Sequence, residues 1–242
     1  MEFDHPFTKD APRATLVVPM TAEPVLVLFT GLGADERLLQ PQHRLPYTLI
    51  TPPWIEPDAS ETLPAYARRM ANTVDWPARF VLGGVSFGGM VAAELAPLLK
   101  PAGLVLVSTC LYARSIPSVS RFINALTKAV EGAGDPSPVS FSRLFLNIFA
   151  EFSEEVQCLM ADMLHQTSVN LLRWASHRIL DWEGAPPPPC PRIWIHGGRD
   201  LVIPVRKVGP DVVIPDGGHL INWTHAEQVN QFIREFVGAL KE

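Results

Sequence analysis

Short hydrophobic runs rich in branched side chains recur along the chain of 242 residues. Several are apolar at every position and do not alternate with polar residues, which is typical of strands buried on both faces of a parallel sheet. The predicted strands cover residues 14–18, 25–30, 48–51, 79–85, 103–109, 192–196 and 212–215.

Apolar residues at helical spacing lie between many of these runs. Residues 60–74 form one predicted helix, with Ser60 as its N-cap. A second runs from Phe87 to about Leu99 and ends before Pro101, and a third covers about 224–240. Strands that alternate with helices predict an α/β fold with a doubly wound, mostly parallel sheet.

Residues 115–183 interrupt this alternation, because they contain no convincing strand. Their apolar spacing predicts four amphipathic helices, and the prolines at 186–189 form a stiff connector to the next strand. The predicted helices cover residues 119–130, 138–149, 154–164 and 168–180. We therefore expect a core domain made of residues 1–114 and 185–242, with residues 115–184 inserted at one edge of the sheet.

Composition and charge narrow the function classes. Hydrophobic residues make up 47% of the chain and charged residues 19%, which is enough apolar material for a sizeable core. The formal net charge is -5, and no basic stripe of the kind that binds nucleic acid is visible. The sequence therefore predicts no nucleic-acid partner, and it leaves the oligomeric state open.

The cysteines and the N-terminal residues bear on the cellular compartment. Cys110, Cys158 and Cys190 are far apart and form no CxxC pair, so we expect reduced thiols and neither a disulfide framework nor a zinc site. The N-terminus lacks the pattern of a signal peptide, and no stretch reaches the ~18 apolar residues of a membrane helix. We expect a cytoplasmic protein without membrane insertion.

The most informative motif is Gly84-Val85-Ser86-Phe87-Gly88, which follows a predicted strand and precedes a predicted helix. In this strand–turn–helix context the pattern G-x-S-x-G holds a serine in a strained turn at the C-terminal edge of the sheet. Gly84 and Gly88 are expected to face each other too closely for larger side chains. Ser86 is therefore the candidate nucleophile, and it needs a general base within hydrogen-bond reach.

His219 is the best candidate for that base. It follows the apolar run 212–215 and the pair Gly217-Gly218, so it lies on a loop at the end of a strand. His196 ends another predicted strand and is the alternative. The other histidines lie in the N-terminal arm, a polar loop, the insertion and the start of the last helix: His5, His43, His165, His177 and His225.

Asp200 is the candidate acid that orients the base. It follows a strand and the turn Gly197-Gly198, so it also projects from the C-terminal end of a strand. Asp211 precedes its strand and would lie at the wrong edge of the sheet, whereas Asp216 could simply stabilise its own loop. The chain order Ser86, Asp200, His219 is the order expected for a nucleophile on such a turn.

Two backbone amides are candidates for stabilising an oxyanion. The apolar run 25–30 leads into Gly31-Leu32-Gly33, a turn whose amides can point at a developing negative charge. The other donor would be the amide directly after the nucleophile. We assign the two donors to Leu32 and Phe87.

These motifs together resemble those of the α/β-hydrolase superfamily, over nearly the whole chain. The resemblance implies an eight-stranded, mostly parallel sheet, and a helical cap inserted between strands six and seven, where residues 115–183 lie. Many members have His-Gly where this chain has Thr30-Gly31, so the hydrogen bonds that shape this loop are expected to differ. The serine at position 86 argues against the dehalogenases and epoxide hydrolases of the superfamily, which use an aspartate there.

The predicted reaction is hydrolysis of a small or medium carboxylic ester through an acyl-enzyme on Ser86, without metal or organic cofactor. Apolar side chains of the insertion, such as Met163 and Trp174, could line an acyl pocket, although most of them are expected to pack helices together. The partner would be a small acyl substrate. A thioesterase, an acyltransferase, a carbon–carbon hydrolase or lyase, and a non-catalytic binding module remain alternatives.

Overall fold

Six parallel strands form the centre of the molecule in the computed structural model, which describes residues 24–112 and 152–240. Their order in the sheet is β2-β1-β3-β4-β5-β6, and every neighbouring pair is parallel. The strands are β1 (Val25–Phe29), β2 (Leu49–Ile50), β3 (Phe80–Val85), β4 (Gly103–Val107), β5 (Arg192–Gly197) and β6 (Val212–Ile214). Each lies within or overlaps one of the predicted apolar runs.

The described part of the chain holds six strands, two fewer than the eight that the resemblance implies for the whole fold. The predicted strand at 14–18 lies outside the described residues. Between β2 and the next helix, the chain contains Pro52, Pro53 and Pro57 and forms no strand. Proline lacks the N–H that a sheet ladder needs, so this stretch crosses the C-terminal edge of the sheet as a loop.

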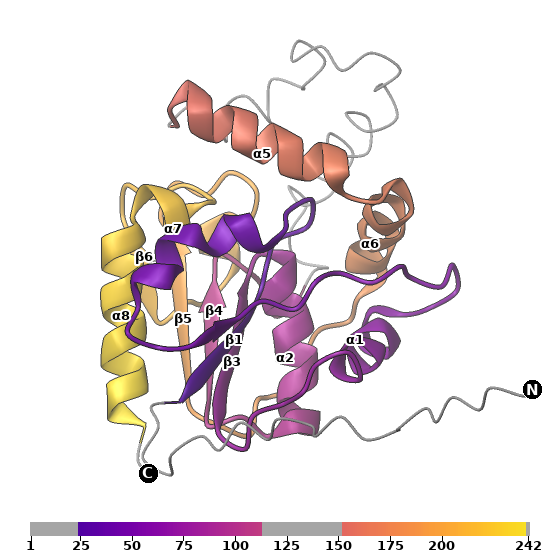
Figure 1. Cartoon of the computed structure of the whole chain (residues 1–242), viewed down its shortest axis with the longest axis horizontal. Helices are drawn as coiled ribbons and strands as arrows, with labels where there is room; N and C mark the ends of the chain where they lie inside the picture. The colour runs from indigo at the N-terminus through magenta and orange to yellow at the C-terminus, as the bar shows by residue number, and fades with distance from the viewer. Residues whose placement is uncertain (1–23, 113–151, 241–242) are drawn as a thin grey trace, which may run out of the picture.

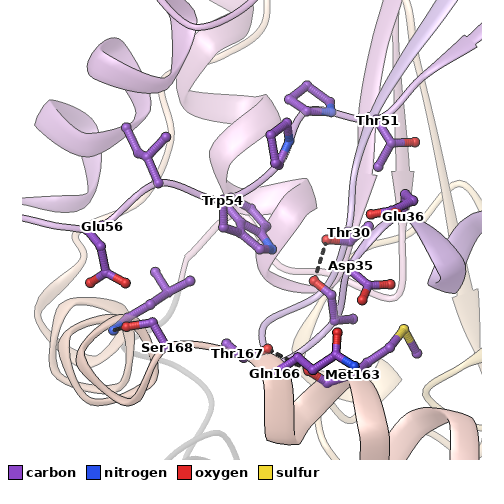
Figure 2. A pocket seen from close by; sticks show the side chains of 15 residues that line it. Thr30, Asp35, Glu36, Thr51, Trp54, Glu56, Met163, Gln166, Thr167 and Ser168 are labelled. Atoms are coloured by element: carbon purple, nitrogen blue, oxygen red, sulfur yellow. Dashed lines mark hydrogen bonds between the residues drawn. The ribbon is translucent and has the colours of Figure 1, made fainter.

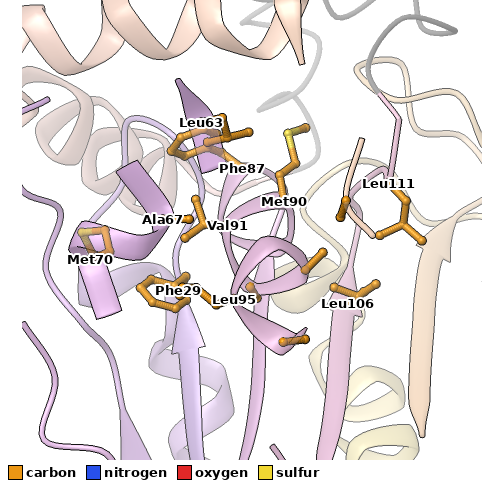
Figure 3. Close-up of a cluster of buried hydrophobic side chains, with 14 of the residues drawn as sticks. Phe29, Leu63, Ala67, Met70, Phe87, Met90, Val91, Leu95, Leu106 and Leu111 are labelled. Atoms are coloured by element: carbon orange, nitrogen blue, oxygen red, sulfur yellow. The ribbon is translucent and has the colours of Figure 1, made fainter. Parts of the chain in front are cut away.

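Side chains alternate between the two faces of the sheet, and both faces are buried. Val27 and Phe29 of β1 belong to one hydrophobic core, whereas Leu26 and Leu28 belong to the other. The first core packs against α1 (Leu63–Ala71), α2 (Phe87–Leu99) and α6 (Val169–Asp181), and Figure 3 shows part of it between α1, α2 and the strands. The second packs against η1 (Glu36–Arg44), α7 (Ile221–Thr224) and α8 (Ala226–Ala239) (Figure 1).

Two helix starts differ from the prediction. The N-cap of α1 is Thr62 and not Ser60, because the Thr62 side chain accepts a hydrogen bond from the amide of Ala65 at 3.3 Å. Pro64 lies in the first turn, where its fixed φ fits a helix. The C-terminal helix α8 begins at Ala226, after the separate short turn α7, and not at residue 224.

The insertion contributes α5 (Glu154–Gln166) and α6, as predicted for this part of the chain. Ser153 and Ser168 cap the two helices. Figure 1 shows α5 above the C-terminal edge of the sheet and α6 beside α1. The helices predicted at 119–130 and 138–149 lie outside the described residues, and the division into core and cap stays a prediction.

The three cysteines are free thiols, and Cys110 is fully buried. Burial raises the pKa of the Cys110 thiol to about 12, so this group stays protonated at neutral pH. Among the helices in the two described ranges, none has the length and apolar character that spanning a membrane requires.

Candidate active site

Ser86 lies at the sharp turn between β3 and α2, as the motif predicts. Its backbone has φ 54° and ψ -117°, a conformation that residues other than glycine rarely adopt. Neighbouring groups hold this conformation: the Ser86 amide donates to the Val107 carbonyl at 2.9 Å. In addition, the Thr109 hydroxyl donates to the Ser86 carbonyl at 2.6 Å. The turn is therefore supported from β4 and from the loop after it.

The two glycines of the motif are required by close backbone contacts. A Cβ atom on Gly84 would lie 2.4 Å from the carbonyl carbon of Gly88. A Cβ atom on Gly88 would lie 2.3 Å from the carbonyl oxygen of Thr30. The predicted close approach of these glycines is confirmed, and it brings the first turn of α2 against the loop after β1.

The His219 side chain reaches Ser86 from the loop after β6. Its Nε2 lies 3.0 Å from the Ser86 Oγ, and its Nδ1 lies 2.8 Å from Oδ2 of Asp200. Because a carboxylate only accepts, we assign the proton to Nδ1, which leaves Nε2 to accept the hydroxyl hydrogen of the serine. The imidazole is buried, with 6% of the residue exposed. Three residues that are far apart in sequence thus form one chain of hydrogen bonds.

Asp200 is fixed by the turn that follows β5. Its Oδ1 accepts hydrogen bonds from the amides of Val202 and Ile203, both at 2.8 Å. Burial acts to raise the pKa of the Asp200 carboxyl. The electrostatic influence of His219 and the hydrogen bonds from His196 and His219 outweigh that effect and hold the pKa below its usual range. The carboxyl is therefore ionised at neutral pH.

His196, the alternative base, lies behind Asp200 and not beside Ser86. Its Nε2 is 2.7 Å from the Ile203 carbonyl oxygen and 3.2 Å from Oδ2 of Asp200. Both neighbours accept, so this nitrogen carries the proton. This contact was not predicted from the sequence, although His196 stands only four residues before Asp200 in the same strand and turn, which was a usable signal.

The two competing aspartates make other contacts. The Asp211 carboxylate accepts from the Trp194 amide at 2.9 Å, at the start of β6 and away from the C-terminal edge of the sheet. Asp216 lies 3.5 Å from Nε2 of His225. The structure thus brings Ser86, Asp200 and His219 together and leaves both competitors out.

Leu32 and Phe87 each lie in a segment next to Ser86. Phe87 is the first residue of α2, where the backbone amides have no acceptor within their own helix. Leu32 follows Gly31, on which a Cβ atom would lie 3.7 Å from the Cβ atom of Ser86. The Thr30 hydroxyl donates to the Ala34 carbonyl at 3.0 Å and so closes the loop between them.

A pocket of about 330 Å³ lies next to these residues, between the loops that follow β1 and β2 and the helices α5 and α6 (Figure 2). Its lining includes Thr30, Asp35, Glu36, Thr51, Trp54, Glu56, Met163, Gln166, Thr167, Ser168 and Leu171. In the two described ranges, no group of three or more His, Cys, Asp or Glu side chains is placed to hold a metal ion.

Comparisons with known proteins agree with this fold. Among solved structures, an esterase (EaEST) from Exiguobacterium antarcticum superposes with a TM-score of 0.70 at 17% identity, over 90% of this chain and 93% of its own. A thermophilic esterase from Thermogutta terrifontis gives a TM-score of 0.64 at 20% identity, over 91% of this chain and 92% of its own. At these identities the likeness shows the fold.

Sequence comparisons give the family. A curated protein of Synechocystis sp., whose name assigns it provisionally to the non-heme chloroperoxidases, is 28% identical over 127 residues. This match covers 43% of the present chain and 44% of that protein, so the chain spans less than half of this relative. The model of the alpha/beta hydrolase family matches residues 10–232, which is most of the sequence. The chain belongs to the alpha/beta hydrolase family.

Proposed function

We propose that this hydrolase cleaves a small or medium carboxylic ester, with Ser86 as nucleophile, His219 as general base and Asp200 as the residue that orients the base. The observation that carries the proposal is the unbroken hydrogen-bond chain from the Ser86 Oγ through His219 to Asp200, with separations of 3.0 and 2.8 Å. A serine hydroxyl is a weak nucleophile at neutral pH, and a histidine at this distance can activate it.

In the first half of the reaction, the Ser86 Oγ attacks the ester carbonyl carbon while Nε2 of His219 takes the hydroxyl proton. The bond between the carbonyl carbon and the alcohol oxygen then breaks, and the alcohol leaves with that proton. The acyl group remains on Ser86. In the second half, water loses a proton to His219 and attacks the acyl carbon. The bond to the Ser86 Oγ breaks, the serine regains its proton, and the acid is released.

The buried Asp200 carboxylate would keep the imidazole of His219 in the required tautomer and stabilise the imidazolium that forms. The amides of Leu32 and Phe87 would donate to the oxyanion, and each such donor accounts for ~10²–10³ in rate in enzymes of this kind. Support for the second donor is that Phe87 directly follows Ser86 at the start of α2. No step of this scheme needs an oxidant, a reductant or a further reactant besides water.

A panel of nitrophenyl esters of increasing acyl length tests the proposal. We expect turnover of short and medium esters, and a loss of about 10⁴-fold or more for Ser86→Ala, because the covalent step then has no nucleophile. Turnover of a thioester with the same acyl group distinguishes an ester hydrolase from a thioesterase. A reaction with added alcohol, analysed for the transesterified product, distinguishes it from an acyltransferase. Equal turnover by Ser86→Ala would contradict the assignment of the nucleophile.

A further inference from the structure

The pocket described above lies close to Gly31 and Phe87, two residues that adjoin Ser86. Thr30, in its wall, directly precedes Gly31, which packs against the Ser86 side chain. Trp54, in the same pocket, contacts the Phe87 ring with 5.1 Å between ring centroids. A substrate whose scissile bond lies at Ser86 can therefore extend one of its ends into this pocket. Its volume of about 330 Å³ is at the lower end of the range for small-molecule sites.

The lining of this pocket mixes apolar side chains, such as Ile55, Met163 and Leu171, with polar ones. Hydroxyl, amide, indole and carboxylate groups face one another across it (Figure 2). Two of the hydroxyls already bond within the protein: Thr30 donates to the Ala34 carbonyl at 3.0 Å, and Thr167 donates to the Met163 carbonyl at 2.9 Å. A long alkyl chain in the pocket would bury the remaining polar side chains without offering them a hydrogen-bond partner, which is unfavourable.

Trp54 supplies a donor that lacks an acceptor in the described part of the chain. Its Nε1 is buried, and no described residue accepts its hydrogen. Figure 2 shows the Trp54 side chain in the middle of the pocket, between Glu56 and Thr30. A buried N–H without an acceptor costs free energy, and an oxygen of a bound molecule would remove that cost.

The charged residues that line the pocket are all acidic. Asp35, Glu36 and Glu56 line it, and none of the other lining residues within the described ranges is a lysine or an arginine. Two guanidinium groups lie beside it, and both are paired with carboxylates. Arg37 is shared between Asp35 and Asp162, at 2.6 Å from each. Arg69 donates to the Glu56 carbonyl and pairs with Glu61, both at 2.7 Å. The cluster therefore keeps a net negative charge, which repels anions and favours groups that donate hydrogen bonds.

We infer that this pocket holds a polar, non-anionic part of the substrate that carries hydrogen-bond donors, such as hydroxyl or ammonium groups. The inference rests on the proposed ester hydrolysis at Ser86, and it gives the substrate class of that same site. An oxygen of the bound group would accept from Trp54, and its O–H or N–H groups would donate to Glu36 and Glu56. Esters with a carboxylate or phosphate at that end would be poor substrates.

Two matched ester series test the inference. One series varies the end of the acyl chain. The other keeps a butanoyl group and varies the end of the alcohol. In each series the end is methyl, hydroxyl, primary ammonium or carboxylate. In one of the two series, we expect kcat/KM for the hydroxyl and ammonium esters to exceed that for the carboxylate ester by about fivefold or more, the size of effect expected from partly exposed charges. The series that shows the preference identifies which end of the substrate enters the pocket.

Variants separate the contributions of individual residues. Glu56→Gln should lower the preference for ammonium over carboxylate by about threefold. Glu235→Gln, on the exposed face of α8, is the matched control and should leave it unchanged. Trp54→Phe keeps an aromatic side chain but removes the N–H together with part of the indole ring, so it should lower kcat/KM for the hydroxyl ester more than for the methyl ester, which reports the loss of packing alone.

The inference would be overturned if kcat/KM were the same for all four end groups in both ester series, in the parent protein and in Glu56→Gln. This holds provided that a fluorophosphonate still labels Ser86. A preference for the carboxylate esters would overturn it as well. Failure of the label at Ser86 would instead contradict the proposed function, and the inference would fall with it. Because Glu56 is exposed, its variant remains informative even where Trp54→Phe disturbs packing.

Discussion

Nε2 of His196 lies 3.2 Å from Oδ2 of Asp200, the same carboxylate oxygen that contacts His219. The second acceptor of this nitrogen is the Ile203 carbonyl at 2.7 Å, which fixes the orientation of the imidazole ring. Together with the amides of Val202 and Ile203, His196 leaves Asp200 little freedom to rotate. His196 is thus a positioning residue for the carboxylate, and its side chain does not approach Ser86.

Replacing His196 tests this role. His196→Leu removes the donor, so Asp200 becomes less constrained and its Oδ2 carries more negative charge toward His219. We expect kcat/KM for a nitrophenyl ester to fall about tenfold, since a hydrogen bond to a charged group contributes about 1.5–3 kcal/mol. The acid limb of the pH profile should move to higher pH, because the imidazolium of His219 is then more stabilised.

His196→Gln is the control, because its amide keeps an N–H at the end of a side chain of similar length. It should recover most of the activity and return the acid limb toward its original position. If His196 only fills space, both variants will lower the amount of folded protein, and neither will move the acid limb of the pH profile.

The pH dependence of stability should report on Asp200. Its pKa is held below the usual range in the folded protein, so ionised Asp200 contributes stability above the unfolded pKa of about 3.9. That contribution is lost as the pH falls from about 4 toward the lower pKa of the folded state. Urea unfolding at pH 6, 4 and 3 should therefore show a smaller loss for Asp200→Asn than for the parent. An identical loss in both proteins would mean that the other carboxylates with lowered pKa, such as Asp35 and Glu61, account for all of it.

The glycine at position 88 should be essential for folding. A Cβ atom there would lie 2.3 Å from the Thr30 carbonyl oxygen and 2.4 Å from the Phe29 carbonyl oxygen, and backbone cannot give way easily. Gly88→Ala should lower the free energy of unfolding by about 3 kcal/mol, at the upper end of the usual overpacking cost. Gly238→Ala is the matched control, because nothing lies within 4 Å of the added carbon in α8. It should raise stability by about 0.5–1 kcal/mol, and chemical unfolding measures both changes.

Thr30→Val tests the loop that carries Leu32. The substitution keeps the shape of the side chain and removes the hydroxyl that donates to the Ala34 carbonyl at 3.0 Å. We expect a loss of about 1–3 kcal/mol in stability, because the buried carbonyl loses its partner. If the Leu32 amide stabilises the oxyanion, kcat should also fall by about tenfold, with a smaller change in KM. Unchanged kcat in a stably folded variant would argue that this loop takes no part in the reaction.

Much of the fold was predictable because the informative patterns are local. Strands such as β1 are buried on both faces, so every position is apolar, and this distinguishes them from the amphipathic helices. The nucleophile turn is recognisable from the five consecutive residues 84–88, although Thr30, Val107 and Thr109 also contact it from distant parts of the chain. Strand ends then bring Asp200 and His219 to the same edge of the sheet.

Other features could not be predicted, either because they depend on contacts between distant segments or because two residues suit the same position almost equally well. Ser60 and Thr62 can both cap a helix, and Thr62 is used, with Pro64 in the first turn. The second contact of Asp200 depends on how the turn after β5 folds back, which brings Ile203 as well as Asp200 onto His196. The Trp54 wall of the pocket lies in a proline-rich loop whose path no periodicity describes.

The central claim is that Ser86 is the nucleophile activated by His219. The most direct measurement is to label the full chain with a fluorophosphonate probe and to map the adduct by mass spectrometry, with Ser86→Ala and His219→Ala alongside. We expect a single adduct on Ser86 in the parent protein and none in Ser86→Ala. Labelling should slow by at least about 100-fold in His219→Ala, the lower range of a general-base contribution. An adduct on another residue, or no adduct in the folded parent protein, would contradict this claim.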